Sequence, residues 1–159
     1  MKRKLIALLL GGMVVAATVY AATATFNIGA TLRAPLTLTW VADVTFGTLD
    51  IPGGAPTVFT VLPDPAGAHT AGATAAPGHF TLLGDTGATA IASVPASTTM
   101  TDGTTTLTVN LSVDATSAGG VLVDPVTPVN VYIGADTTVT NTDTAGAYTG
   151  TSTLTVVYQ

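Results

Sequence analysis

Apolar and polar residues alternate without interruption between residues 22 and 46. Every even position from 24 onward is apolar, and nearly every odd position is polar or glycine. Successive side chains of a β-strand point to opposite faces, so a period of two predicts strands with one buried face. A single strand of this length would span roughly 80 Å, against a usual length of about 17–20 Å. The stretch therefore predicts two strands, 24–33 and 36–46, joined at Pro35, which donates no ladder hydrogen bond.

The same period returns in several later segments. Residues 105–115 alternate most regularly, which predicts one inward and one outward row of side chains. The inward row is Leu107, Val109, Leu111 and Val113, and the outward row is Thr106, Thr108, Asn110 and Ser112. Other strands are predicted at 57–62, 79–84, 88–94, 129–135 and 146–159. The sequence GDTG at 84–87 is a turn signal and predicts that the strands on either side of it form a hairpin.

These segments predict an all-β fold, because no segment after residue 22 has a helical period. Short strands at this spacing are typical of a β-sandwich or of a closed sheet. The residues predicted to form the core are Trp40, Phe46, Leu107, Leu111, Val156 and Tyr158. Residues 63–78 are small and flexible, and we expect them to form a surface loop of unusual length.

Residues 1–21 have the three parts of a secretory signal peptide. A basic start at 2–4 precedes an apolar run from Leu5 and a small-x-small ending at 19–21. We therefore expect cleavage at this ending and export from a bacterial cell, to the medium or the cell surface. The alternative is an uncleaved anchor helix, because the apolar run approaches the length that spans a bilayer. No membrane contact is expected after cleavage.

Removal of this leader leaves a chain with a single basic residue. Arg33 stands against nine Asp, a net charge of −8, and there is no Lys, Glu or Cys. Nucleic acids and anionic lipids are bound through Lys and Arg, so neither is an expected partner. Without Cys or Lys the chain forms neither disulfides nor Lys–Asn cross-links. Any assembly that it makes is therefore non-covalent.

The sequence contains no recognisable catalytic or metal-binding constellation. His69 and His79 are the only histidines, and both fall in or beside the 63–78 loop, so we expect them to be solvated. The Asp residues are scattered singly, most of them beside Gly, Pro or Thr, which is typical of turn-forming Asp. No Ser lies in a G-x-S-x-G motif. We expect no enzymatic activity, no cofactor and no bound metal.

Five short motifs are shared with a known group of proteins. They are F-G-x-L at 46–49, G-x-x-G-A at 84–88, I-G at 133–134, G-x-Y-x-G at 146–150 and L-x-V-x-Y at 154–158. With the alternating N-terminal strand, the chain resembles a family of short secreted bacterial β-proteins that is similar to fimbrial and spore-coat-U-type pilin subunits. The resemblance implies an immunoglobulin-like antiparallel β-sandwich that is displayed outside the cell as a filament subunit.

Three regions are therefore predicted: the leader 1–21, an N-terminal strand 22–34 and a β-sandwich 35–159. We hypothesise that the N-terminal strand is donated to another copy of the chain, where its apolar row fills a groove. The residues of this row are Phe26, Ile28, Ala30 and Leu32. The expected partners are copies of the same chain, with host or abiotic surfaces as further candidates.

Other interpretations of the same sequence remain open. The chain could act as a monomeric adhesin whose loops carry recognition. Its rows of Thr could bind an ordered surface such as ice or a polysaccharide, although Thr is also the polar residue best suited to strands. The strand 22–34 could remain in its own sheet, as tied-down N-terminal strands commonly do.

Overall fold

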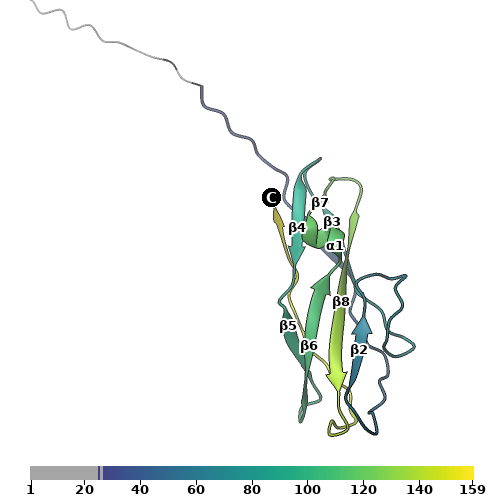
Figure 1. The fold of residues 1–159 in the computed structure, drawn as a ribbon. Helices are drawn as coiled ribbons and strands as arrows, with labels where there is room; N and C mark the ends of the chain where they lie inside the picture. Colours follow the sequence, from purple (N-terminus) through teal and green to yellow (C-terminus); the bar gives the residue numbers. More distant parts are fainter. Residues whose placement is uncertain (1–24, 26) are drawn as a thin grey trace, which may run out of the picture. The chain divides into compact units, whose positions relative to one another are not determined.

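The computed structural model describes residue 25 and residues 27–159 (Figure 1). The predicted leader and Phe26 of the predicted donor strand lie outside the described residues. Residues Leu32–Gln159 form one compact unit, in which the described chain has nine strands and one short helix. The predicted all-β fold is confirmed, because these strands form two antiparallel sheets that pack as a sandwich. Within the described residues, no helix has the length and hydrophobicity that crossing a bilayer requires.

The larger sheet contains six strands. They are β1 (Thr37–Ala42), β2 (Thr57–Val61), β3 (Gly78–Leu83), β5 (Ser97–Thr101), β6 (Thr106–Val113) and β8 (Val129–Val139). The order is β1-β3-β8-β6-β5, and β2 also pairs with β8. β8 pairs with β3 through residues 129–133 and with β2 through residues 135–139, while β6 occupies its other edge. β8 is therefore the central strand of the sandwich.

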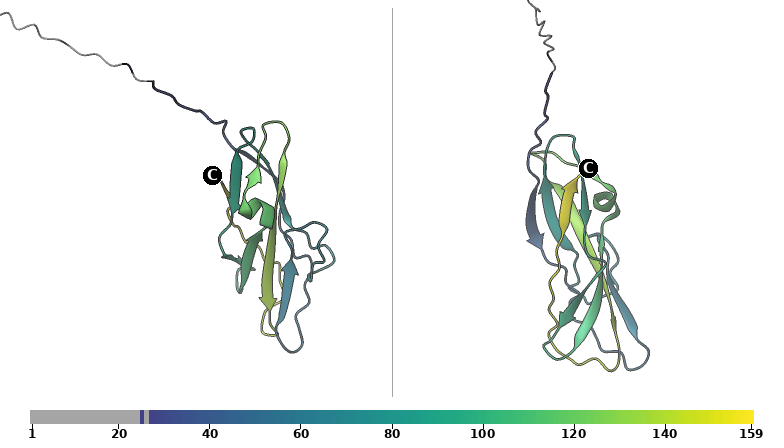
Figure 2. Two further views of the ribbon diagram at one scale, coloured as in Figure 1. Left: turned by 45° about the horizontal axis from the view of Figure 1, so that its top comes forward. Right: turned by 90° about the vertical axis from the view of Figure 1, so that its left-hand side faces the viewer.

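The smaller sheet lies at one end of the sandwich (Figure 2). It consists of β7 (Val121–Leu122), β4 (Thr89–Ser93) and β9 (Thr155–Tyr158), in the order β7-β4-β9, with helix α1 (Ala115–Gly119) against β4. The core cluster between the two sheets is Leu82, Ala90, Ala92, Val123, Val131 and Ile133. A second cluster, Phe46, Val61, Val109 and Ala135, packs instead against loop residues such as Leu49, Ala71 and Ala75. The smaller sheet thus covers only part of the larger one.

The prediction that 79–84 and 88–94 form a hairpin is wrong. β3 and β4 lie in different sheets, and the GDTG connection passes from one sheet to the other. Gly87 has a φ of +73°, a conformation that favours glycine, and its N–H donates to the carbonyl of Val123 at 3.1 Å. A turn signal marks a change of chain direction, but it does not determine whether the flanking strands pair.

Three elements were not predicted from the sequence: β5, helix α1 and the two-residue strand β7. β5 and β6 form a hairpin that turns at Asp102–Gly103. Asp-Gly is a strong hairpin signal, but β5 was not predicted because it has only one large apolar residue, Met100. Helix α1 contradicts the expectation of no helix. Its N-cap is Asp114, whose carboxylate accepts the N–H of Ser117 at 2.9 Å. A single capped turn is too short to produce a helical period.

The predicted core is confirmed for Phe46 and Leu107, is only partly buried at three positions and is wrong for Trp40. Phe46 and Leu107 are buried, and Leu111, Val156 and Tyr158 are half-buried. Trp40 is 59% exposed, so its assignment to the core is wrong. It pairs with Phe80 on the inner side of the larger sheet, as its alternation phase predicts. Phase decides the face on which a side chain lies, whereas burial also needs a second layer above that face.

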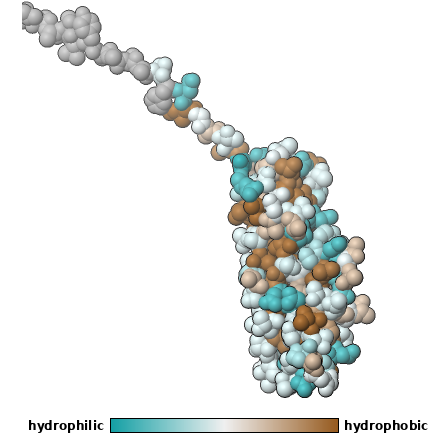
Figure 3. Space-filling model, viewed as in Figure 1, coloured by the Kyte–Doolittle hydropathy of each residue, from teal (hydrophilic) through white to brown (hydrophobic). Residues whose placement is uncertain are grey.

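The outer face of β6 matches the prediction. Thr106, Thr108, Asn110 and Ser112 are all exposed there, while Leu107 and Val109 are buried on the other face. Thr99 and Thr101 of β5 pair with Thr108 and Thr106, which extends the row of hydroxyl groups across two strands. Much of the surface in Figure 3 is accordingly pale, because weakly polar residues such as Thr and Gly take the place of charged ones.

Candidate functional site

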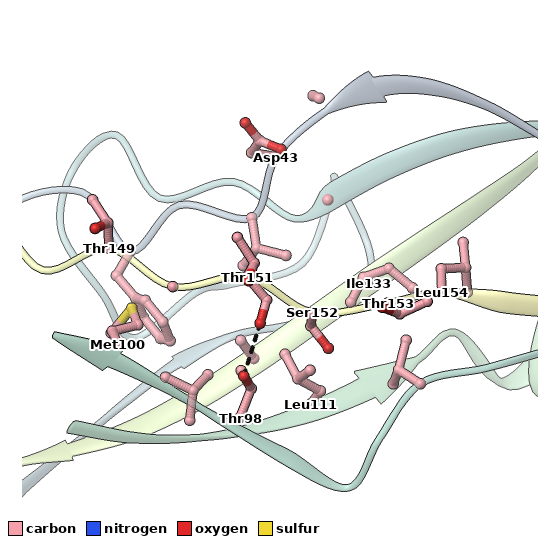
Figure 4. Close-up of a pocket in the computed structure, with 18 of the residues that line it drawn as sticks. Asp43, Thr98, Met100, Leu111, Ile133, Thr149, Thr151, Ser152, Thr153 and Leu154 are labelled. Atoms are coloured by element: carbon pink, nitrogen blue, oxygen red, sulfur yellow. Dashed lines mark hydrogen bonds between the residues drawn. The ribbon is translucent and has the colours of Figure 1, made fainter. Parts of the chain in front are cut away.

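An apolar groove lies over the inner face of the larger sheet (Figure 4). It has a volume of about 400 Å³. The smaller sheet borders it through Val94, which follows β4, and Leu154, which precedes β9. The floor consists of Phe80, Val109, Leu111, Ile133 and Ala135, from β3, β6 and β8. Asp43 is the only charged residue that lines it. The groove therefore has the composition of a protein core without a complete second layer.

One side of the groove is residues 148–154, which we call the C-terminal rim. Thr149 exchanges two backbone hydrogen bonds with Thr101, at 2.9 and 3.0 Å. The carbonyl of Thr151 accepts the hydroxyl of Thr98 at 2.9 Å (Figure 4). Residues 150–154 have no backbone-to-backbone hydrogen bond within the described part of the chain, and the ladder resumes only at Thr155. This rim is an extended segment with unpaired main-chain groups, as at the edge of a sheet.

The G-x-Y-x-G motif at 146–150 holds the beginning of this rim in place. A Cβ atom on Gly150 would lie 2.3 Å from the carbonyl oxygen of Thr99, so the close approach to β5 requires glycine. The Tyr148 hydroxyl donates to the carbonyl of Thr144 at 2.9 Å and contacts the Thr105 hydroxyl. A tyrosine that bonds back to the chain a few residues upstream is also a feature of immunoglobulin-type sandwiches.

The other side of the groove is formed by residues 42–46, which we call the N-terminal rim. The predicted strand 36–46 is shorter in the structure, because β1 ends at Ala42 after a register shift relative to β3. β1 pairs only with β3, so its second edge is free within the described chain. Leu38 and Trp40 are exposed next to this edge, and the Trp40 indole donates to Asp43 at 3.0 Å. Large apolar side chains therefore stand beside an unpaired strand edge.

The chain enters the sandwich beside the end of β9. Arg33 donates from its guanidinium to the main-chain carbonyl of Gln159 at 3.0 Å. The Tyr158 hydroxyl donates to the carbonyl of Ala34 at 2.8 Å and accepts the N–H of Asp85 at 2.7 Å. We call this group the junction; it consists of Arg33, Ala34, Asp85, Tyr158 and Gln159. The junction places the start of the sandwich, residues 33 and 34, beside the C-terminal end of β9. β9 is the strand that follows the C-terminal rim.

Three of the four predicted donor residues, Ile28, Ala30 and Leu32, lie among the described residues. Ile28 and Leu32 are 86% and 92% exposed, and Ala30 is also exposed. Residues 27–34 have no ladder partner among the described residues. Phe26 lies outside the described residues, and donation of residues 22–34 to another copy stays a prediction.

The two histidines differ from the expectation of solvated loop residues. His79 lies in β3, where its ring stacks on Tyr132 with centroids 4.8 Å apart and bonds to the Asn130 side chain at 3.0 Å. His69 lies in the loop, but its Nδ1 accepts the N–H of Leu62 at 3.1 Å. Neither is a free surface residue. Among the described residues, no group of three or more His, Cys, Asp or Glu side chains is arranged to hold a metal.

The groove itself could not be identified from the sequence. Its floor residues are recognisable as inward-facing, but alternation does not indicate what lies opposite them. The C-terminal rim is part of the predicted strand 146–159, yet only Thr155–Tyr158 enter a ladder. The run of small residues Gly150–Thr153 is the one local signal that this part packs weakly.

Comparison with known proteins gives one match. Residues 36–158 match a sequence family described as a domain of unknown function, DUF4402. The matched range contains both rims and the floor of the groove. No curated protein and no solved structure matches the chain.

Proposed function

We propose that this chain, which belongs to the DUF4402 family, is a structural subunit of an extracellular non-covalent filament built by strand donation between copies. One observation carries the proposal. The chain combines an open apolar groove with an exposed segment whose apolar residues alternate. β-strand addition requires both of these features, because the backbone of the added strand pairs with an edge while alternate side chains enter pockets.

The arm, which we define as residues 22–32 of the predicted donor strand 22–34, suits the groove in length and chemistry. From Phe26 to Leu32 an extended strand spans roughly 20 Å, which is comparable with the seven-residue C-terminal rim at about 3.3 Å per residue. The arm carries no charged residue, so insertion beside a strongly acidic sandwich involves no charge repulsion. Each buried Phe, Ile or Leu side chain contributes about 1.5–3 kcal/mol, so the apolar row could hold two subunits together without a covalent link.

The junction determines which assemblies strand donation can build. The arm ends at Leu32, directly before Arg33 and Ala34, which bond to the C-terminal end of β9. If a donated arm runs parallel to the neighbour's rim and β9, the two junction ends meet, and each copy can donate to the other in a closed pair. If it runs antiparallel, the junction end of one copy meets the opposite end of the next, and the contact repeats without closing. A filament therefore requires the antiparallel direction.

Removal of the arm tests the proposal directly. Arg33 is the only Lys or Arg after residue 4, so trypsin has a single site in the leaderless chain, directly after the arm. We expect the leaderless chain to form fibres of uniform width in electron microscopy. The trypsin-cut chain, or one that begins at Arg33, should remain a folded monomer in sedimentation. A peptide of residues 23–32 should raise its melting temperature. Fibres from the armless chain would exclude strand donation.

Engineered cysteines test the direction of the donated strand. The chain has no native Cys, so every disulfide reports on the introduced pair. In the antiparallel arrangement, Thr31→Cys with Thr151→Cys should give a ladder of covalent multimers on non-reducing gels. The matched pair Thr25→Cys with Thr151→Cys should not, because residue 25 would lie at the far end of the neighbour's rim and β9. The reverse pattern, ending at dimers, would indicate closed pairs.

A monomeric adhesin or surface-binding module is the second candidate. Exposed Trp40 favours it, since aromatic side chains are common at recognition surfaces. In the filament, an inserted arm would cover this region of β1. Trp40 fluorescence therefore distinguishes the two functions. A blue shift as the leaderless chain is concentrated supports the filament, and a shift only on addition of a polysaccharide supports the adhesin.

A further inference from the structure

Arg33 is the one basic side chain after residue 4, and it is held at the boundary between the arm and the sandwich. Its guanidinium donates to the carbonyl of Gln159 at 3.0 Å and lies 5.4 Å from the centroid of the Tyr158 ring. A guanidinium within about 6 Å of an aromatic face is attracted by the electrons of the ring. Arg33 therefore connects the first residues of the sandwich to its last strand by two different interactions.

Tyr158 fixes the main chain at the same boundary. Its hydroxyl donates to Ala34 at 2.8 Å and accepts from Asp85 at 2.7 Å, so one group joins the start of the sandwich, β9 and the β3–β4 connection. Pro35 follows directly, and its ring restricts both its own φ and the conformation of Ala34. The chain at 33–35 is thus constrained by two side chains and a proline.

We propose that Arg33 and Tyr158 are positioning residues that prevent the arm from entering the groove of its own subunit, so that insertion occurs between copies. The inference rests on the proposed function, because it assumes that the groove accepts an arm. The groove of the same chain is the strongest competitor for an arm, since an intramolecular segment has an effective concentration in the millimolar range. A filament subunit needs a device that suppresses this competition.

The geometry of the junction supplies such a device. If the row up to Leu32 is to enter its own groove while β1 still begins at Thr37, the arm must reverse direction within residues 33–36. These residues are Arg-Ala-Pro-Leu, and tight hairpin turns need positive φ at positions filled by Gly, Asn or Asp. The reversal would also reorient the Ala34 carbonyl and Arg33, which separates them from Tyr158 and Gln159. The junction therefore opposes self-insertion without obstructing the groove.

The test compares the leaderless chain with a double variant, Arg33→Gln with Tyr158→Phe. The Phe keeps the ring that packs in the core and removes only the hydroxyl. We expect the double variant to need a concentration at least about tenfold higher to form fibres, since the loss of two hydrogen bonds is of this size. Below that concentration, hydrogen exchange of arm residues 27–32 should be slowed in the variant monomer and fast in the wild-type monomer.

Two control variants isolate the junction. Tyr132→Phe removes a hydroxyl that makes no hydrogen bond within the described part of the chain, and it should assemble like the wild type. Arg33→Lys keeps a donor and a cation at the same place and should restore most of the assembly that Arg33→Gln loses. Melting temperatures of all variants, measured below the assembly concentration, would reveal any that are unfolded.

Every outcome bears on the inference. An unchanged fibre-forming concentration with a fast-exchanging arm in the double variant would overturn the junction's role and leave strand donation standing. Lost assembly with a fast-exchanging arm would overturn it as well, because the arm would not have entered its own groove. Slow hydrogen exchange of the arm in the wild-type monomer would also overturn the junction's role, because the arm would already occupy its own groove. A wild-type chain that never assembles would overturn the proposed function, and the inference with it.

Discussion

At the scale of single residues, the Asp side chains organise turns. Asp102 accepts the N–H groups of Thr104 and Thr105 at 2.8 and 2.7 Å, and Asp124 accepts those of Val126 and Thr127 at 2.8 and 2.9 Å. The backbone N–H of Thr105 and then that of Thr104 lower the pKa of Asp102. The N–H groups of Thr127 and Val126 lower that of Asp124. Stability at these turns therefore depends on ionised carboxylates.

This dependence predicts a loss of stability in acid. A depressed folded pKa gives stability that is complete above the unfolded pKa, about 3.9 for Asp, and that disappears as the pH falls through the lower folded value. The melting temperature should therefore fall below about pH 4, and Asp102→Asn should reduce that fall. Asp50→Asn is the matched control, because this exposed carboxylate accepts no hydrogen bond within the described chain. Identical pH profiles for the wild type and Asp102→Asn would contradict the prediction.

Leu82 and Leu111 distinguish the closed core from the open groove. Leu82 is fully buried, so Leu82→Ala should destabilise the monomer by about 2–5 kcal/mol in urea denaturation. Leu111 is only half-buried on the groove floor, so Leu111→Ala should cost less in the monomer. In assembled material the cost at Leu111 should increase, because an inserted arm completes its burial. Equal costs for the two variants in the armless monomer would show that the groove is closed.

At the scale of elements, the two sides of the groove are strand edges of different kinds. The N-terminal rim continues from β1, whose second edge is free within the described chain, whereas the C-terminal rim is an extended segment that pairs again only at Thr155. Free edges are a risk in any soluble sandwich, because they pair with other chains. The long 63–78 loop shows the usual remedy, since Thr70 bridges to Thr60 and covers the edge of β2. The rims of the groove are held by single bridges, Thr45 to Ala76 and Thr149 to Thr101, whereas residues 150–154 have no backbone-to-backbone bond within the described chain.

The position of the C-terminal rim should depend on Gly150. Gly150→Ala places a Cβ against the Thr99 carbonyl, so the rim must move away from β5. We expect a destabilisation of about 1–3 kcal/mol in chemical denaturation, as for other overpacked sites, and weaker fibre formation. Gly53→Ala is the control, because no atom lies within 4 Å of its added Cβ. A neutral Gly150→Ala variant would show that the rim is not held against β5.

At the scale of the whole molecule, the proposed strand donation predicts that stability depends on concentration. A partner that binds only the folded state raises the melting temperature as its concentration increases, and here the partner is the same chain. The leaderless chain should therefore melt at higher temperature when it is concentrated, while the armless chain should melt at one temperature in calorimetry. A melting temperature that is independent of concentration in both would contradict assembly through the arm.

The sequence alone determined the features that depend on neighbouring residues. Strand type follows from alternation, as in 105–115, because adjacent side chains of an extended backbone must point to opposite faces. Turns with an Asp at their start follow in the same way, since an Asp carboxylate reaches N–H groups two or three residues ahead. The apolar row at Ile28, Ala30 and Leu32 follows from the same alternation.

The tertiary structure decided what depends on residues far apart in the chain. Alternation places Trp40 on the inner face. It is exposed because the smaller sheet does not extend over it. The GDTG turn is local, but β3 and β4 do not pair with each other because β3 pairs with β8 and β4 pairs with β9. The groove exists because the chain supplies one layer there and only part of a second. Burial is a relation between segments, so no local pattern could have specified it.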